Sequence, residues 1–292
     1  MANTKDLRIK IDSTRKTQQT TRAMKMVSAA KLRRAQHAIV NSRPYARKMD
    51  AVISHISKTQ NVTHPLLLVP ETTKRLLLVV LTSDRGLCGA FNSNVIRFSD
   101  RYYSEMKSKY EKIDIFCFGR RGGDHFRRRG VEPIETVVNL AKDIDYGLAA
   151  DVADRLLNWY LTGEYDEVRF VFNEFKSALS QRVVAETLIP IRPEERQAEE
   201  TEMPVSPDII FEPGPEAILE QLLKRNFAIQ VYRCLQESIA SEHGARMNAM
   251  ENATKNAGEM IRNLTLKMNK IRQAAITTEL IEITSGAEAL NA

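Results

Sequence analysis

Two glycine-bearing loops are the parts of this sequence whose residues could bind a phosphate group. Residues 83–89 read SDRGLCG and residues 119–123 read GRRGG, and each follows a short apolar run typical of a β-strand. Loops in this position bind phosphates in doubly wound sheets. Neither loop has the glycine spacing of a dinucleotide site or the Lys-Ser/Thr of a phosphate loop. We therefore expect tight strand-to-helix turns, with phosphate binding as the less favoured alternative.

The cysteines and histidines do not form a recognisable reactive site. Cys88, Cys117 and Cys234 are odd in number and widely spaced, which predicts reduced thiols rather than disulfides or a zinc site. Cys88 has no histidine near it in sequence, so a packed thiol is favoured over a nucleophile. The five histidines have no metal-ligand spacing (His37, His55, His64, His125 and His243). We expect no cofactor, no metal and no enzyme that acts alone.

The elements that hold the two loops alternate between strand and helix. Apolar runs at 75–82, 113–118, 168–172 and 183–188 predict strands, and the patterns at 92–110 and 146–161 predict helices. This alternation favours a mostly parallel sheet flanked by helices, in a central Rossmann-like α/β domain over residues 74–207. The Glu-, Pro- and Arg-rich residues 192–207 indicate a solvated connection.

Long helical patterns occupy both ends of the chain. From Pro215 to about 290 no further proline occurs, and an apolar stripe recurs at steps of three and four (Met250, Ala253, Ala257, Met260, Leu264, Met268, Ile271, Ala275). One helix of this length would run on the order of 110 Å, so it needs a second helix to cover its stripe. We place the N-terminal helix at 1–60, with a kink at Pro44, and the C-terminal helix at 214–292. The N-terminal helix has its own predicted apolar stripe (Leu7, Ile11, Ala23, Met26, Val27, Ala30, Ala38, Met49, Val52, Ile53, Ile56).

The N-terminal helix is strongly basic. Residues 1–58 contain 14 Lys and Arg residues against Asp6, Asp12 and Asp50, whereas residues 215–292 contain 9 basic and 9 acidic residues. Such a helix suits either nucleic acid or an acidic protein surface, and composition alone leaves both open. Against nucleic acid, the segment holds one aromatic residue, Tyr45, and no reading motif.

Neither a membrane span nor a secretory signal is expected. No apolar run approaches 18 residues, and the N-terminus, MANTKDLRIK, lacks the apolar core of a signal peptide. We therefore expect the chain in the cytoplasm.

The C-terminal residues 276–289, ITTELIEITSGAEA, resemble the signature of the gamma subunits of bacterial F-type ATP synthases. The signature matches at Ile276, Thr277, Glu279, Glu282, Gly286 and Ala287. The resemblance continues at residues 23–27 (AMKMV), 42–45 (SRPY), 83–89 and 245–247 (ARM), in the family's order and over the whole chain. The cysteine-bearing insertion of chloroplast gamma subunits is missing, so no thiol regulation is implied.

The resemblance implies a rotor shaft without catalytic residues of its own. The terminal helices would form an antiparallel two-helix coiled coil beside a Rossmann-like domain that binds no nucleotide. The coil would stand inside a ring of three alpha and three beta subunits. Its foot, with the epsilon subunit, would sit on the c-ring at the cytoplasmic face of the inner membrane. Proton flow would then turn the shaft and drive ATP synthesis in the beta subunits.

The resemblance also assigns individual residues. Met24, Arg246 and Gln273 match positions that affect coupling between rotation and catalysis, and Arg272, Gln273 and Thr277 match the part that hydrogen-bonds a beta subunit. Phe211 and Glu212 match the foot that meets the c-ring. The implied partners are therefore the alpha, beta and epsilon subunits and the c-ring, and no nucleic acid.

Overall fold

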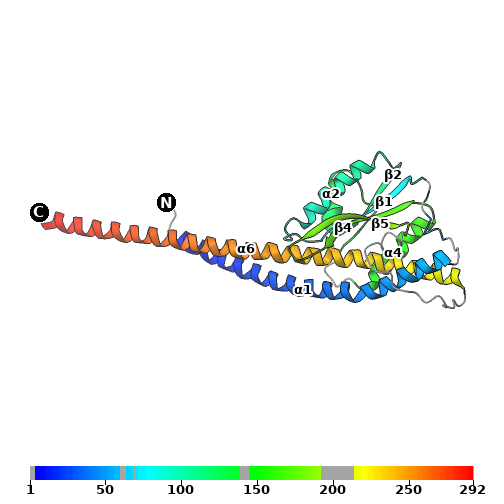
Figure 1. The fold of residues 1–292 in the computed structure, drawn as a ribbon. Helices are drawn as coiled ribbons and strands as arrows, with labels where there is room; N and C mark the ends of the chain where they lie inside the picture. Colours follow the sequence, from blue (N-terminus) through cyan, green and yellow to red (C-terminus); the bar gives the residue numbers. More distant parts are fainter. Residues whose placement is uncertain are drawn as a thin grey trace. The chain divides into compact units, whose positions relative to one another are not determined.

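The computed structural model describes residues 4–59, 64–68, 70, 72–138, 145–191 and 214–291 (Figure 1). A helix of 56 residues, α1 (Thr4–Thr59), comes first and a helix of 77 residues, α6 (Pro215–Asn291), comes last. Between them, the described residues form α2 (Phe91–Met106), α3 (Arg120–Arg128), α4 (Tyr146–Leu161) and five strands. No helix in the described part of the chain is both long and apolar enough to cross a membrane.

The five strands form one mostly parallel sheet in the order β3-β2-β1-β4-β5. The strands are β1 (Arg75–Leu81), β2 (Lys112–Phe118), β3 (Glu135–Val137), β4 (Glu167–Phe175) and β5 (Gln181–Ile189). Strands β1 to β4 pair in parallel, and only β5 runs antiparallel, as the second strand of a hairpin with β4. The predicted α/β domain with a mostly parallel sheet is therefore confirmed.

Side chains of β1 alternate between two cores, one on each face of the sheet. Leu77, Val79 and Leu81 pack with α4 and with parts of α1 and α6, whereas Leu78 and Val80 pack with α2 and α3. Because both faces are covered, the strand is apolar along its whole length, as buried parallel strands are. This explains why the run RLLLVVL was readable as a strand from the sequence.

The chain divides into two compact units, and both contain parts of the long helices. Unit 1 is Met1–Ser28 with Met247–Ala292, and unit 2 is Ala29–Arg246. In unit 1 the α1–α6 contacts run antiparallel, since Thr21 meets Thr254 and Lys25 meets Glu251. In unit 2 Asn226 donates to Asp50 at 2.6 Å, again with the helices antiparallel. The predicted antiparallel coiled coil is confirmed.

The buried face of α1 follows a heptad pattern that differs from the predicted stripe. Its buried and half-buried positions alternate by four and three residues and include many polar side chains (Leu7, Ile11, Thr14, Gln18, Thr21, Lys25, Ser28, Leu32, Ala35, Ile39). Met26 and Val27, which we had placed in the apolar stripe, are 62% and 58% exposed. That part of the prediction was wrong because the seam opposite the small residues of α6 is polar here.

Several elements between the long helices also differ from the sequence prediction. The helix expected at 92–110 ends at Met106, and the strand expected at 75–82 ends at Leu81. Helix α3 and the three-residue strand β3 were not expected. Helix α3 buries only Gly122, Gly123 and Phe126, so it has no apolar stripe to read. Pro44 lies inside α1, so it does not end the helix.

Candidate functional site

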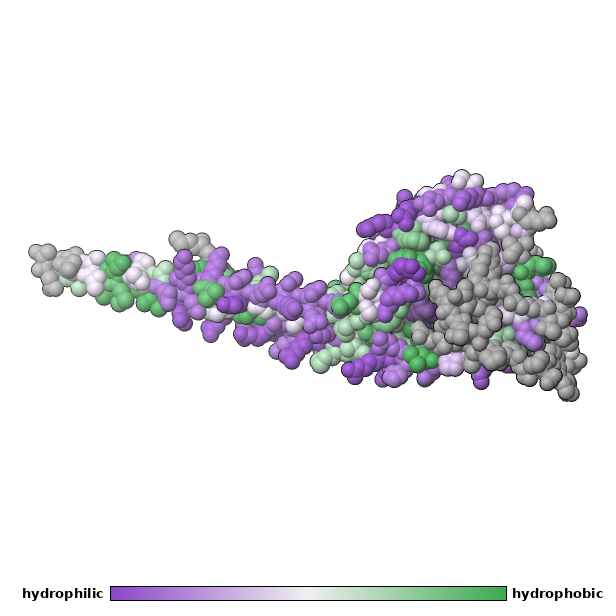
Figure 2. All heavy atoms as spheres, viewed as in Figure 1, coloured by the Kyte–Doolittle hydropathy of each residue, from purple (hydrophilic) through white to green (hydrophobic). Residues whose placement is uncertain are grey.

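The C-terminal end of α6 is the most exposed helical segment of unit 1. Every position from Arg272 to Ala287 is exposed, although the segment carries several large apolar residues. Ile276, Leu280 and Ile283 are 49%, 57% and 68% exposed and recur at helical spacing, so they form one stripe. Figure 2 shows apolar side chains gathered along this end of α6. An unpartnered apolar stripe of this kind indicates a surface that another protein covers.

The signature residues and three of the predicted contact residues lie together on this segment. Arg272, Gln273 and Thr277 are exposed, as are Ile276, Glu279, Glu282, Gly286 and Ala287. The Thr277 hydroxyl donates to the Gln273 carbonyl oxygen at 3.0 Å, so it can offer only its lone pairs to a partner. The Arg272 guanidinium and the Gln273 amide supply the donors at this place.

Met24 lies on α1, beside the seam of the coil rather than in it. Its side chain is half-buried, and the next residue, Lys25, forms an ion pair of 2.9 Å with Glu251 of α6. Within the AMKMV motif, Ala23, Met26 and Val27 are exposed. The motif therefore presents apolar side chains to solvent on the face away from α6, which favours a partner contact over simple packing.

A polar layer fixes how α1 and α6 meet in unit 1. The Thr21 and Thr254 hydroxyl oxygens lie 2.8 Å apart, and the Gln18 amide donates to the Thr254 carbonyl oxygen at 3.3 Å. Beside them, a Cβ on Gly258 would lie 3.0 Å from the Gln18 amide nitrogen. Polar groups in a coiled-coil seam specify register at a cost in stability. Gly258 therefore permits a close approach of the two helices.

Arg246 lies in unit 2, in a cluster that joins α6 to the loop after β1. Its guanidinium forms an ion pair with Glu242 at 2.6 Å and donates to the Gly86 carbonyl oxygen at 3.3 Å. It also lies 3.4 Å from Nδ1 of His243. The side chains of Arg246 and Glu242 are only 12% and 17% exposed. Arg246 therefore links α6 to residues 83–89 and is not a free surface charge.

Burial controls the protonation of this cluster. Desolvation raises the pKa of the Glu242 carboxyl, although the neighbouring Arg246 opposes the shift. Desolvation, with help from Arg246 and Lys31, lowers the pKa of His243 to about 4. His243 is therefore neutral at pH 7, which suits Nδ1 as an acceptor from Arg246.

Protein groups already accept hydrogen bonds from the N-terminus of α3, in the second of the two glycine-bearing loops. The backbone N–H groups of Arg120, Arg121 and Gly122 donate to Asp84 Oδ1, the Ser83 carbonyl oxygen and Thr82 Oγ1. Gly119 precedes them with a φ of 87°, and a Cβ there would lie 2.2 Å from the Thr82 carbonyl oxygen. These contacts support the prediction of tight turns, because no free N–H group of this turn points at a ligand.

The buried thiols and scattered histidines do not form a reactive site. Cys88 is 1% exposed, and burial raises the pKa of its thiol, which keeps it protonated and unreactive at neutral pH. Within the described residues, no group of three or more His, Cys, Asp or Glu side chains could hold a metal ion.

The predicted site residues are distributed over both units, and two of them lie outside the described residues. Met24 and the segment from Arg272 to Ala287 belong to unit 1, and the antiparallel pairing sets Met24 opposite α6 residues near 252, about 30 Å along the helix from Arg272. Arg246 belongs to unit 2. Phe211 and Glu212 lie outside the described residues. Sequence reasoning missed Glu242, although its spacing of four residues from Arg246 is a typical helical ion-pair signal.

Comparison with known proteins identifies the family. The family model described as ATP synthase matches residues 3–290. The ATP synthase gamma chain of Bdellovibrio bacteriovorus is 57% identical over 293 residues, and that of Geobacter metallireducens is 44% identical over 290 residues. Each alignment covers 99% of this chain and 99% of the relative.

Solved structures agree with this relationship. A chain of the Tetrahymena thermophila mitochondrial ATP synthase central stalk and c-ring structure is 29% identical, with a TM-score of 0.59, over 80% of this chain and 99% of that chain. A chain of the Euglena gracilis mitochondrial ATP synthase structure with OSCP, F1 and c-ring has a TM-score of 0.67 at 22% identity, over 98% and 94%. At this low identity, the second structure supports only the assignment of the fold. With a family match and relatives that span the whole length, the chain belongs to the ATP synthase gamma chain family.

Proposed function

We propose that this chain is the rotor shaft of a bacterial F-type ATP synthase, coupling proton-driven rotation of a c-ring to the conformational cycle of catalytic beta subunits. The observation that carries the proposal is the exposed C-terminal end of α6. This segment extends past the residues that pair with α1 and presents an apolar stripe with Arg272 and Gln273 beside it. A ring of alpha and beta subunits would cover that stripe.

The shaft would act through contact energy rather than through chemistry. A rotor can move a catalytic site only if it contacts the conformations of that site with different free energies. The exposed faces support such differences, because Arg272 and Gln273 offer donors and Ile276, Leu280 and Ile283 offer apolar area on one segment. The basic N-terminal helix would add attraction to acidic surfaces of beta subunits.

The same proposal makes the chain a non-catalytic subunit. The filled turn before α3 and the buried, protonated Cys88 support this role. The chain would be held at the cytoplasmic face of the membrane through the c-ring and the epsilon subunit, with the foot near Phe211 and Glu212. The functional parts would be the helices at 1–60 and 214–292 and the α/β domain at 74–207.

Co-expression with alpha, beta and epsilon subunits tests the proposal. The chain should co-purify with them as one complex that hydrolyses ATP, and truncation of the chain before Arg272 should weaken coupling to proton pumping. Absence of the chain from an otherwise active complex would contradict the proposal. The nucleic-acid alternative requires a steeply salt-dependent affinity for DNA or RNA in the complex.

A further inference from the structure

We propose that Arg233 is a positioning residue that fixes α6 to the β4–β5 hairpin. Torque on the α/β domain would then be transmitted to α6 without movement of the helix against the sheet. The inference rests on the proposed rotor function and concerns unit 2 alone. It assigns a role to a group of charged residues that neither the sequence prediction nor the proposed partner contacts involve.

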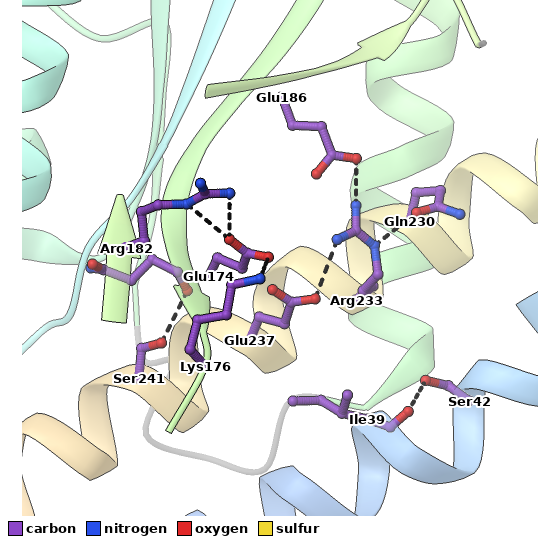
Figure 3. Close-up of polar contacts among 11 residues, drawn as sticks. Ile39, Ser42, Glu174, Lys176, Arg182, Glu186, Gln230, Arg233, Glu237 and Ser241 are labelled. Atoms are coloured by element: carbon purple, nitrogen blue, oxygen red, sulfur yellow. Dashed lines mark hydrogen bonds and ion pairs between the residues drawn. The ribbon is translucent and has the colours of Figure 1, made fainter. Parts of the chain in front are cut away.

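The guanidinium of Arg233 uses all three of its nitrogen atoms within unit 2 (Figure 3). It donates to Glu186 Oε1 of β5 at 2.5 Å, to Glu237 Oε1 at 3.2 Å and to Gln230 Oε1 at 2.9 Å. Its Cζ atom lies 5.9 Å from the centre of the Phe172 ring of β4, which is fully buried. These contacts hold the planar group in one orientation against both strands of the hairpin.

A second and a third contact follow along the same side of α6. The Ser241 hydroxyl donates to the Asn173 carbonyl oxygen of β4 at 3.0 Å, and a Cβ on Gly244 would lie 3.4 Å from the backbone of Ala178 in the hairpin turn. Arg233 and Ser241 are eight residues apart, or about 12 Å along the helix. Two directional bonds at separate heights oppose both sliding and rotation of α6 on the sheet, which apolar packing alone opposes weakly.

The electrostatics favour an attachment that stays formed. Desolvation by burial lowers the pKa of the Arg233 guanidinium, but its interactions with Cys234, Glu186 and Glu237 outweigh this effect and raise the pKa above its usual range. The second carboxylate oxygen of Glu237 is buried without a hydrogen-bond partner among the described residues. Removing Arg233 would leave two carboxylates close together and poorly solvated, so the helix would move away from the hairpin.

Arg182 provides a matched control on the same hairpin. It forms an ion pair with Glu174 at 3.0 Å, and Lys176 forms another with the same carboxylate at 2.6 Å. The side chain of Arg182 is 70% exposed, and its bonds stay within the hairpin. Arg182→Met therefore removes an arginine and an ion pair from this region without removing a bond to α6.

The test uses the complete enzyme in membrane vesicles, with Arg233→Met, Arg233→Lys, Glu186→Gln and Arg182→Met. ATP hydrolysis and the steady-state proton gradient are measured together, and assembly is checked by subunit content. We expect Arg233→Met to hydrolyse ATP while its steady-state proton gradient falls severalfold. Arg233→Lys, which keeps the charge and one contact, should give an intermediate gradient, and Arg182→Met should match the wild type.

The readout separates positioning from a merely structural role. Loss of stability alone would lower assembly and hydrolysis together and leave the gradient per assembled complex unchanged, which would overturn the inference. If Arg233→Met does not assemble, Glu186→Gln decides in its place, because it keeps the volume and an acceptor but removes the charge. Normal assembly with an unchanged gradient in that variant would also overturn it. A wild-type complex that lacks this chain would instead refute the rotor proposal.

Discussion

Arg246→Met should destabilise unit 2 strongly, because it leaves Glu242 without its partner. The ion pair is 2.6 Å long between side chains that are 12% and 17% exposed, and the same guanidinium holds the Gly86 carbonyl oxygen. Breaking a buried pair by removing one member costs about 3–5 kcal/mol. The loss of the bond to Gly86 should also release residues 83–89 from α6.

The assay is urea unfolding at low protein concentration, followed by the fluorescence of Trp159, the single tryptophan of the chain. Trp159 lies in unit 2 with ring contacts to Phe116 and Tyr165, so its emission reports the packing of the α/β core. The double variant Arg246→Met with Glu242→Leu should recover most of the loss, since it removes both charges together. A cost below about 1 kcal/mol for the single variant would refute our reasoning, because such costs are typical of exposed pairs.

The remaining predictions concern coupling, pH, ligands and association. Met24→Lys should leave assembly and ATP hydrolysis largely intact but lower the ratio of proton pumping to hydrolysis in vesicles. The new lysine would pair with a beta carboxylate in only some rotor positions, and a pair worth up to about 1 kcal/mol would stabilise those positions relative to the others. An unchanged ratio would show that Met24 is only a packing residue. His243 is neutral in the folded chain with a pKa of about 4, below its unfolded value near 6.5. Its contribution to the free energy of unfolding is therefore complete above pH 6.5 and is lost as the pH falls toward 4. At pH 5 the free energy of unfolding should be about 1–2 kcal/mol lower than at pH 7, and His243→Gln should remove this loss. Glu242, with its raised pKa, changes the free energy of unfolding in the opposite direction, and it does so in both the wild type and the His243 variant. The isolated chain should bind no ATP, which micromolar binding by calorimetry would contradict. It should also self-associate through the exposed stripe of α6, which light scattering at increasing concentration would detect and strictly monomeric behaviour would contradict.

The sheet was predictable because its strands are buried on both faces and therefore read as continuous apolar runs. Strand β3 was not predicted because it has only three residues. Helix α3 was not predicted because arginine and glycine dominate it and Phe126 is its only large buried apolar side chain. Hydrophobic periodicity finds elements with an apolar face, and neither of these has one.

The coil was predictable as an antiparallel helix pair, but its seam was not. Thr14, Gln18, Thr21, Lys25 and Ser28 occupy seam positions of α1, where a search for apolar residues does not look. Their partners on α6 decide which polar residues can be buried, as the contact between Thr21 and Thr254 illustrates. Such pairings become visible only when both helices are placed together.

The candidate site was predictable to different degrees in its parts. The exposure of the segment from Arg272 onward follows from the greater length of α6, whose end has no residues of α1 beside it. The burial of Arg246 was not predictable, because it depends on a loop that lies 160 residues earlier in the chain. The contacts of Arg233 with β4 and β5 likewise required the fold.

The most direct test of the rotor function is to watch this chain turn inside its complex. All three native cysteines are buried, so Leu179→Cys, at a position that is 85% exposed in the β4–β5 turn, offers a selective attachment point for a bead. With the alpha and beta subunits fixed to a surface, added ATP should drive the bead in one direction, and omission of ATP should stop it. A bead that stays still while the same complexes hydrolyse ATP at the normal rate would contradict the rotor function.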